Sequence, residues 1–204
     1  FDFWFAKLNS HGDILWRKTF GSFWFETPHS FAILNDGGYL LTGGVGGSGG
    51  NVSCSNPDRG VWVIKLDSAG NEIWQNCYGG SSYDNAFDIT ESSDGGFYIG
   101  ATTMSNDGDV SGWIGYYDYW IIKCDSTGSI LWEKCFGGPD YEYIRSVAAS
   151  FDGGVIACGY SKGGLSGSHG MDDAFVVKLD AQGNLEWQKC FGGSYNDAAN
   201  SILQ

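Results

Sequence analysis

The sequence predicts an all-β fold built from repeats of one four-stranded antiparallel unit. Three observations predict it: a tryptophan phrase that recurs at a nearly fixed interval, a glycine-closed turn before each tryptophan, and an Asp-Gly-Gly turn in each complete repeat. Self-similarity of this length indicates copies of one supersecondary unit that cover one another's apolar faces. The tryptophans, at intervals of 58, 58 and 55 residues, are Trp16, Trp74, Trp132 and Trp187.

Each recurring tryptophan belongs to a predicted hairpin. Upstream of it lies an apolar stretch with a lysine, followed by a four-residue turn that opens with Asn or Asp, as at 67–70. An Asn or Asp side chain can bond the backbone two residues on, and a closing glycine can adopt the left-handed conformation of a tight bulged hairpin. We therefore expect a strand on either side of each turn. The closing glycines are Gly12, Gly70, Gly128 and Gly183.

A second hairpin is predicted around each Asp-Gly-Gly sequence. These turns stand at 36–38, 94–96 and 152–154, with apolar or alternating stretches on both sides. Four strands per unit follow, which we name A and B around the Asp-Gly-Gly turn and C and D around the other turn. The three residues missing from the last interval fall between strands B and C, where the copies also differ most. The B–C loops are therefore the expected variable face, where binding residues concentrate.

Four-stranded units of this length, stacked by repetition, are typical of β-propeller blades, either in a ring or as an open propeller segment. The predicted division is a partial blade of strands C and D at 1–20, blades at 21–78, 79–136 and 137–191, and the start of a further blade at 192–204. Because C–D hairpins outnumber A–B hairpins, we expect a portion of a longer array. Its first expected partners are other repeats of the same chain.

Composition and charge restrict the expected partners. Hydrophobic residues make up 42% of the chain and aromatic residues 16%, enough for a packed interior. Eleven basic against 24 acidic residues give a net charge of −13, which disfavours nucleic acid because phosphate contacts need clustered Lys and Arg. The sequence has no run of 18 apolar residues, so membrane insertion is not expected. No signal peptide is visible either, so the export signals of a secreted protein would lie outside this segment.

Three of the six cysteines share one position at the end of strand D: Cys77, Cys135 and Cys190. Antiparallel pairing places Cys77 opposite approximately residue 60, within reach of Cys54 in the preceding loop. A disulfide is one interpretation, because secretion permits it. Small buried thiols are the alternative.

Two resemblances extend these predictions. The C–D phrase is an apolar strand, Leu-Asp, a short turn, Gly and then Trp, as at 62–74. It resembles the tryptophan-docking motif of quinoprotein-like β-propellers, which implies that the indole of strand D packs on the neighbouring blade. With phrases such as Trp132-Glu-Lys-Cys-Phe-Gly-Gly, the whole chain resembles repeats of secreted or cell-surface Bacteroidota proteins exported by the type IX secretion system. That resemblance implies an extracellular or cell-surface location. It also implies O-glycosylation at Ser68 and Ser126, each of which follows an Asp in an exposed turn.

Two loop features are candidate binding sites. Asp107, Asp109 and Ser111 place oxygen ligands at alternate positions around a glycine, as Ca²⁺ prefers, but the distal bidentate Glu of a helix-loop-helix site is absent. A plain Asx turn is the alternative. Large aromatic residues outside the repeat register suit a sugar or protein partner, with inter-blade packing as the alternative. They are Trp24, Trp113, Tyr116 and Tyr117.

Other polar and glycine-rich positions are expected to serve the fold. An acidic residue before strand A is expected to satisfy backbone donors of the adjoining turn, with a ligand site at a channel mouth as the alternative. The strand C lysine is expected to bury its stem and pair across strands. The glycines at 44–49 match a dinucleotide fingerprint in spacing, but a loop is favoured because no helix pattern follows. The acids are Glu26, Asp84, Glu142 and Asp197, and the lysines are Lys7, Lys65, Lys123 and Lys178.

The repetition explains nearly all recurring residues as parts of the fold. We therefore expect a non-enzymatic extracellular repeat module with a structural, adhesive or protein-interaction role and no bound cofactor other than calcium. The first alternative is a carbohydrate-binding propeller that uses the loop aromatics. The second is a quinoprotein-like enzyme or a lyase.

Overall fold

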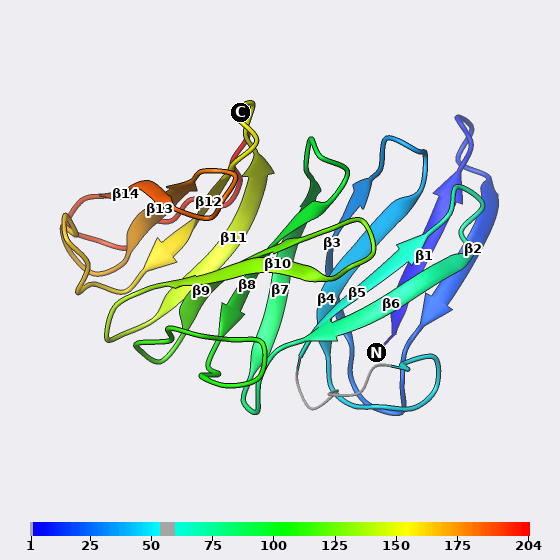
Figure 1. The fold of residues 1–204 in the computed structure, drawn as a ribbon, viewed down its shortest axis with the longest axis horizontal. Helices are drawn as coiled ribbons and strands as arrows, with labels where there is room; N and C mark the ends of the chain where they lie inside the picture. The colour runs from blue at the N-terminus through cyan, green and yellow to red at the C-terminus, as the bar shows by residue number, and fades with distance from the viewer. Residues whose placement is uncertain (1, 54–59) are drawn as a thin grey trace.

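The computed structural model describes residues 2–53 and 60–204, which form 14 strands and no helix. The strands lie in one two-stranded and three four-stranded antiparallel sheets, which follow one another in chain order like the blades of a propeller (Figure 1). Within these residues no helix exists that could cross a membrane. The predicted all-β fold of repeated antiparallel blades is confirmed.

Each four-stranded sheet takes its strands in sequence order, so strands A, B, C and D are direct neighbours. The two-stranded sheet holds β1 (Phe3–Leu8) and β2 (Ile14–Phe20). The next sheet holds β3 (Thr27–Ile33), β4 (Tyr39–Val45), β5 (Gly60–Leu66) and β6 (Glu72–Tyr78). The third holds β7 (Asp84–Glu91), β8 (Phe97–Thr103), β9 (Asp118–Cys124) and β10 (Ile130–Phe136). The last holds β11 (Glu142–Ala149), β12 (Val155–Ser161), β13 (Asp173–Leu179) and β14 (Leu185–Phe191).

The hydrophobic cores lie between successive sheets. Side chains alternate across a strand, so Leu40 of β4 contributes to the core shared with the third sheet, while Leu41 contributes to the core shared with β1 and β2. In the same way Tyr98 and Ile99 of β8 enter different cores. Strands β8 and β9 are buried throughout, because both of their faces are covered. Each sheet therefore depends on its neighbours for burial.

The recurring tryptophans lie against glycines of the following sheet. A methyl group at Gly70 would lie 3.1 Å from the indole of Trp16, and one at Gly183 would lie 2.8 Å from Cδ2 of Trp132. Trp132 also donates its indole N–H to the Ala181 carbonyl oxygen at 3.1 Å. The left-handed backbone of each turn glycine leaves the flat surface on which the indole rests. Trp74 has the equivalent position beside Gly128.

The two ends of the array differ from these junctions. Trp187 is 38% exposed, and the Lys189 ammonium lies 5.9 Å from the centre of its ring. Gly12 has a left-handed φ of 86°, yet a methyl group there would meet no atom within 4 Å. Gly12 and Gly183 therefore share a backbone conformation and differ in whether an indole covers them.

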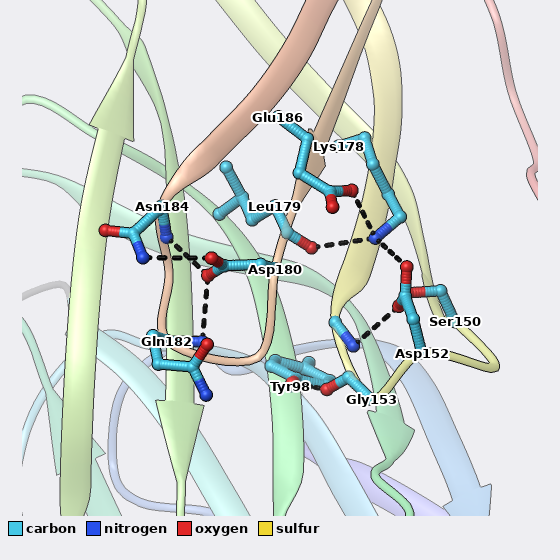
Figure 2. A network of polar contacts seen from close by, with 11 residues as sticks. Tyr98, Ser150, Asp152, Gly153, Lys178, Leu179, Asp180, Gln182, Asn184 and Glu186 are labelled. Carbon is cyan, nitrogen blue, oxygen red and sulfur yellow. Dashed lines mark hydrogen bonds and ion pairs between the residues drawn. The ribbon is translucent and has the colours of Figure 1, made fainter.

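Two of the strand C lysines, Lys123 and Lys178, hold the A–B turn of their own sheet. Lys178 donates to Asp152 at 2.8 Å, to Glu186 at 2.9 Å and to the Leu179 carbonyl oxygen at 3.0 Å (Figure 2). Lys123, only 2% exposed, pairs likewise with Asp94 at 2.7 Å. The sequence predicts that these lysines pair across strands. In the structure, the main ionic partner of both is instead the Asp of the Asp-Gly-Gly turn. That turn lies over strand C because strands B and C are neighbours.

The C–D turns are held by their opening Asp, as predicted. Asp180 accepts hydrogen bonds from the backbone N–H groups of Gln182 and Asn184 at 2.9 and 2.8 Å (Figure 2). The equivalent Asp67 and Asp125 bind their turns in the same way. Adjacent sheets are also tied through a tyrosine, since the Tyr98 hydroxyl donates to the Gly153 carbonyl oxygen at 2.6 Å (Figure 2).

The cysteines of the strand D position differ between copies. Cys77 is disulfide-bonded, whereas Cys135 and Cys190 are free thiols that pack partly buried against the inter-sheet cores. Cys54, the partner expected for Cys77, lies outside the described residues. Burial raises the pKa of the Cys124 thiol to about 12 and that of Cys158 to about 11, so these thiols are unreactive at neutral pH.

The contact between indole and glycine is testable by comparing two glycines. Gly12→Ala should cost about 1–2 kcal/mol, the strain of a left-handed alanine. Gly183→Ala should cost about 1–3 kcal/mol more, because its methyl group also collides with Trp132. Urea unfolding of both variants measures the difference, and equal losses would contradict the packing of Trp132 on Gly183.

The turn ion pair should make stability depend on pH. Burial raises the pKa of Asp94, but bonds from Lys123, Ser92 and the Gly96 N–H outweigh it and bring the pKa to about 2. Because the folded pKa is depressed, this stabilisation is present above pH 4 and is lost as pH falls from about 4 to 2. Asp94→Asn should therefore cost about 1–2 kcal/mol at pH 7, a figure limited by solvent screening at this half-exposed carboxylate.

The repeat supplies a control for this prediction. Asp36 accepts the same turn hydrogen bond from the Gly38 N–H at 2.8 Å, while Lys65 donates instead to the Ser126 carbonyl oxygen at 3.5 Å. Asp36→Asn should lose less free energy at pH 7 than Asp94→Asn. If Asp94→Asn lowers the free energy of unfolding by the same amount at pH 7 and at pH 2, the ion pair contributes nothing to stability.

A candidate binding site along one edge of the sheets

The antiparallel strand order gathers two sets of connections at one edge of the array. The A–B and C–D turns leave each sheet at one end, so the B–C loops and the D–A connections between sheets must lie at the other. Figure 1 shows these connections along the lower edge, including the green loop between β8 and β9. The most variable segments therefore adjoin the junctions between blades.

Buried acids fix the D–A connections. The Asp84 side chain accepts hydrogen bonds from the Gly80 N–H at 2.8 Å, from the Ser105 hydroxyl at 2.9 Å and from the Thr103 hydroxyl. Glu142 accepts the Gly138 N–H in the same way. Burial raises the pKa of Asp84, and these bonds oppose that rise. The prediction that these acids accept hydrogen bonds from the backbone of the adjoining turn is confirmed. Glu26, Asp84 and Glu142 are buried, whereas Asp197 is exposed.

The residue before each buried acid is aromatic and faces outward at this edge. Phe25 and Tyr83 line the same pocket, and Tyr141 stacks on Tyr116 with ring centres 5.1 Å apart. Because the neighbouring carboxylate anchors the backbone, these rings are presented in fixed positions. We call the whole set the aromatic edge. It consists of Trp24, Phe25, Tyr83, Trp113, Tyr116, Tyr117, Tyr141, Tyr143 and Tyr160.

Tyrosines continue the aromatic edge onto the last sheet. Tyr117 lies 4.9 Å from Tyr143, which lies 5.2 Å from Tyr160, measured between ring centres. Burial, followed by the neighbouring Tyr117, raises the pKa of Tyr143 to about 12. The Tyr143 hydroxyl is therefore protonated at neutral pH. Lys162, 5.2 Å from the Tyr141 ring centre, supplies a positive charge at this end.

Three adjoining pockets lie along the aromatic edge. The first, of about 440 Å³, lies between Trp24 and Tyr83, and the second, of about 610 Å³, shares both of these residues. The third, of about 480 Å³, contains Trp113 and shares Ser82 and Met104 with the second. Each volume falls in the range of small-molecule sites. Shared walls make the three pockets a continuous row across two junctions.

The glycine-rich segment after β4 makes room for Trp24. A methyl group at Gly47 would lie 2.3 Å from Cδ1 of the indole, and one at Gly46 would lie 2.7 Å from the Phe25 carbonyl oxygen. The Trp24 backbone N–H bonds the Ser22 hydroxyl at 2.9 Å, and Ser22 in turn bonds Glu26. The indole thus lies against the Gly47 backbone, with its own backbone held by Ser22, while it remains 62% exposed. The loop interpretation is confirmed for the described residues 46–53, which contain no helix, while Gly44 and Val45 end strand β4.

Two buried polar atoms in these pockets have no hydrogen-bond partner within the described part of the protein. They are Oδ1 of Asn85 in the first pocket and the indole N–H of Trp113 in the third. An unpaired buried group of this kind costs about 1–3 kcal/mol. Both atoms belong to residues that line the pockets, but both are buried away from the pocket surface.

The structure brings most of the predicted aromatic residues together. Trp24 lines the first two pockets, and Trp113 and Tyr116 line the third. Tyr117 instead packs among Tyr83, Tyr141 and Tyr143, and so fits inter-blade packing better. The sequence interpretation missed Tyr83 and Tyr141, although an aromatic residue before each of the first three repeated acids was the available signal.

The predicted calcium ligands bond three separate partners. Asp107 accepts the Ser81 N–H at 2.7 Å, and Asp109 accepts the Gly79 N–H at 3.1 Å. Ser111 donates its hydroxyl to Glu133 at 2.5 Å. In residues 2–53 and 60–204, no group of three His, Cys, Asp or Glu side chains is placed to hold a metal ion. The predicted glycosylation residues Ser68 and Ser126 are exposed in their C–D turns, with modification still a prediction.

Comparisons with known proteins support the fold. No protein-family model matches the chain. Over 190 residues it is 26% identical to the regulatory protein FlaEY of Caulobacter vibrioides, a match that covers 86% of this chain and 19% of that protein. A solved structure of a protein of unknown function from Bacteroides caccae is 13% identical with a TM-score of 0.50, covering 95% of this chain and 56% of that one. The chain thus shares its all-β, propeller-like blade fold with a Bacteroides protein.

The buried acids should differ from the exposed one in their effect on stability. Asp84→Ala should cost about 1–3 kcal/mol, because it leaves the Gly80 N–H and two hydroxyl groups without their buried partner. Asp197→Ala removes the equivalent bond to the Gly193 N–H at an exposed position, where water replaces it, and should cost under about 0.5 kcal/mol. Guanidinium unfolding compares the two, and similar losses would count against the anchoring role.

Proposed function

We propose that this chain is a non-enzymatic extracellular repeat module that adheres to a surface partner through the aromatic edge. The observation that carries the proposal is the row of adjoining pockets whose aromatic walls come from successive blades. Exposed, rigid aromatic residues gathered in one patch are typical of binding sites for partners. The repeated sheets supply a rigid support, and the connections between them supply the contacts.

The state of the buried acids favours binding over catalysis at this edge. Glu26, Asp84 and Glu142 are occupied by hydrogen bonds from the turns that they hold. A general acid or base must instead reach the proton of a substrate. These carboxylates thus have a structural role that accounts for their repetition.

An extracellular location accords with the disulfide at Cys77, because disulfides persist in oxidising compartments. The net charge of −13 suits a soluble exposed surface. Three further parts of the proposal rest on the sequence resemblances. They are export through the type IX system, O-glycosylation of Ser68 and Ser126, and kinship with tryptophan-docking propellers. In this proposal, the indole contacts hold the repeats in a rigid array that exposes the aromatic edge.

Adhesion of coated beads tests this proposal. Beads carrying the chain should adhere to at least one immobilised material among mucin, collagen, fibronectin and bacterial cell walls. Combining Trp24→Ala, Tyr83→Ala, Trp113→Ala and Tyr116→Ala should reduce adhesion at least tenfold, since the pocket walls are removed. The control combines Ile73→Ala, Leu131→Ala and Phe151→Ala, which remove exposed apolar residues outside the aromatic edge and should leave adhesion intact. Equal adhesion of the two variants would contradict the proposal.

A further inference from the structure

We infer that the first two pockets of the aromatic edge bind a neutral oligosaccharide, with Trp24 as its stacking surface and the Tyr83 hydroxyl, positioned by Asn85, as its hydrogen-bonding partner. This inference rests on the proposed function and names the chemical class of the ligand. Three features of the pockets support it: hydroxyl groups on the lining, an aromatic face and the absence of charge on most of the lining.

The Asn85 amide is held in a fixed orientation. Asn85 is 6% exposed, and its Nδ2 donates to the Tyr83 hydroxyl oxygen at 3.0 Å and lies 3.2 Å from Nε2 of His29. Oδ1 is thereby left without a partner, beside Gly44. A methyl group at Gly44 would lie 2.6 Å from this oxygen, so the Gly44 backbone covers it closely. Asn85 lines the first pocket together with Tyr83, whose hydroxyl it holds in position.

Two hydroxyl groups complete the polar side of this pocket. The Tyr83 hydroxyl accepts a bond from Asn85 and retains its own proton for donation. Thr27 lines the same pocket. Hydroxyl groups on the lining match the rim of a sugar ring, where each hydroxyl both donates and accepts.

The Trp24 indole supplies the apolar side. It is 62% exposed and seated against the Gly47 backbone, so its position is set before a ligand arrives. The face of a pyranose ring that carries C–H groups is apolar and slightly positive, which suits the negative face of an indole. A sugar stacked on Trp24 therefore presents its hydroxyl rim within the pocket that Tyr83 also lines.

The lining excludes an anionic ligand. Asp84 is the one charged residue of the first pocket, and its carboxylate is bonded to the adjoining turn. The second and third pockets are lined without charged residues. Uronic or sialic acids would thus find no cation there and would meet a chain with a net charge of −13. The row of pockets, ending at Trp113, suits several linked neutral sugars.

Titration calorimetry with defined oligosaccharides tests this inference. The probes are cello-, malto-, manno-, xylo- and chito-oligosaccharides (the last N-acetylated), with oligogalacturonate as the anionic comparison. At least one neutral probe should bind, and Trp24→Ala should weaken its binding at least tenfold, whereas Trp24→Phe should retain most of it. Trp4→Ala removes an indole of similar exposure, 58%, on β1 outside the aromatic edge and should have no effect. Asn85→Ala should weaken binding about fivefold, and circular dichroism verifies that each variant is folded.

Several results would overturn the inference. They are failure of every neutral probe to bind, tighter binding of oligogalacturonate, or binding that Trp24→Ala leaves unchanged. Adhesion of coated beads that depends on the aromatic edge, but is abolished by protease treatment of the target and unaffected by deglycosylation, would identify a protein partner. In that case the glycan inference fails while the adhesive function stands. Loss of the adhesive function itself would appear as equal adhesion by the edge variant and the wild type.

Discussion

The contact between a strand D indole and a glycine of the next sheet is the interaction on which this structure depends. None of the sheets encloses a core of its own, because the residues of each central strand divide between the cores on its two faces. Stability therefore resides in the junctions, as in other repeat arrays. Trp16, Trp74 and Trp132 cover the outer side of these junctions, and the glycine under each indole is required both for its left-handed backbone and for its missing side chain.

The binding edge follows from the same architecture. Antiparallel order in each sheet places the B–C loops and the D–A connections together, and the buried acids hold the connections that join one blade to the next. Rings beside these acids, such as Tyr83 and Tyr141, are consequently fixed relative to both blades. The pockets lie where blades meet, so the array length sets how far the row of pockets extends. Rigidity at the junctions thus preorganises the surface that we propose for adhesion.

Local sequence rules predicted the fold because each strand is bounded by a turn with its own chemistry. The Asp-Gly-Gly and glycine-closed turns set the hairpins, and the strands were found around them. The site was predictable only in part. Trp24, Trp113 and Tyr116 could be identified because they lie outside the repeat register. Tyr83 was missed because an aromatic residue recurs at its position in the repeat. The free oxygen of Asn85 and the pairing of Lys123 with Asp94 depend on side-chain geometry between strands, which periodicity does not contain.

Amide hydrogen exchange of the wild type and Trp132→Ala tests the central claim most directly. If sheets are stabilised by their junctions, removing this indole should reduce protection on both sides, in β7–β10 and in β11–β14, because the core between them is shared. Protection in β3–β6 should change little, since its junctions retain Trp16 and Trp74. A loss confined to β10, with β11–β14 protected as in the wild type, would show that each sheet is stable alone and would contradict the account.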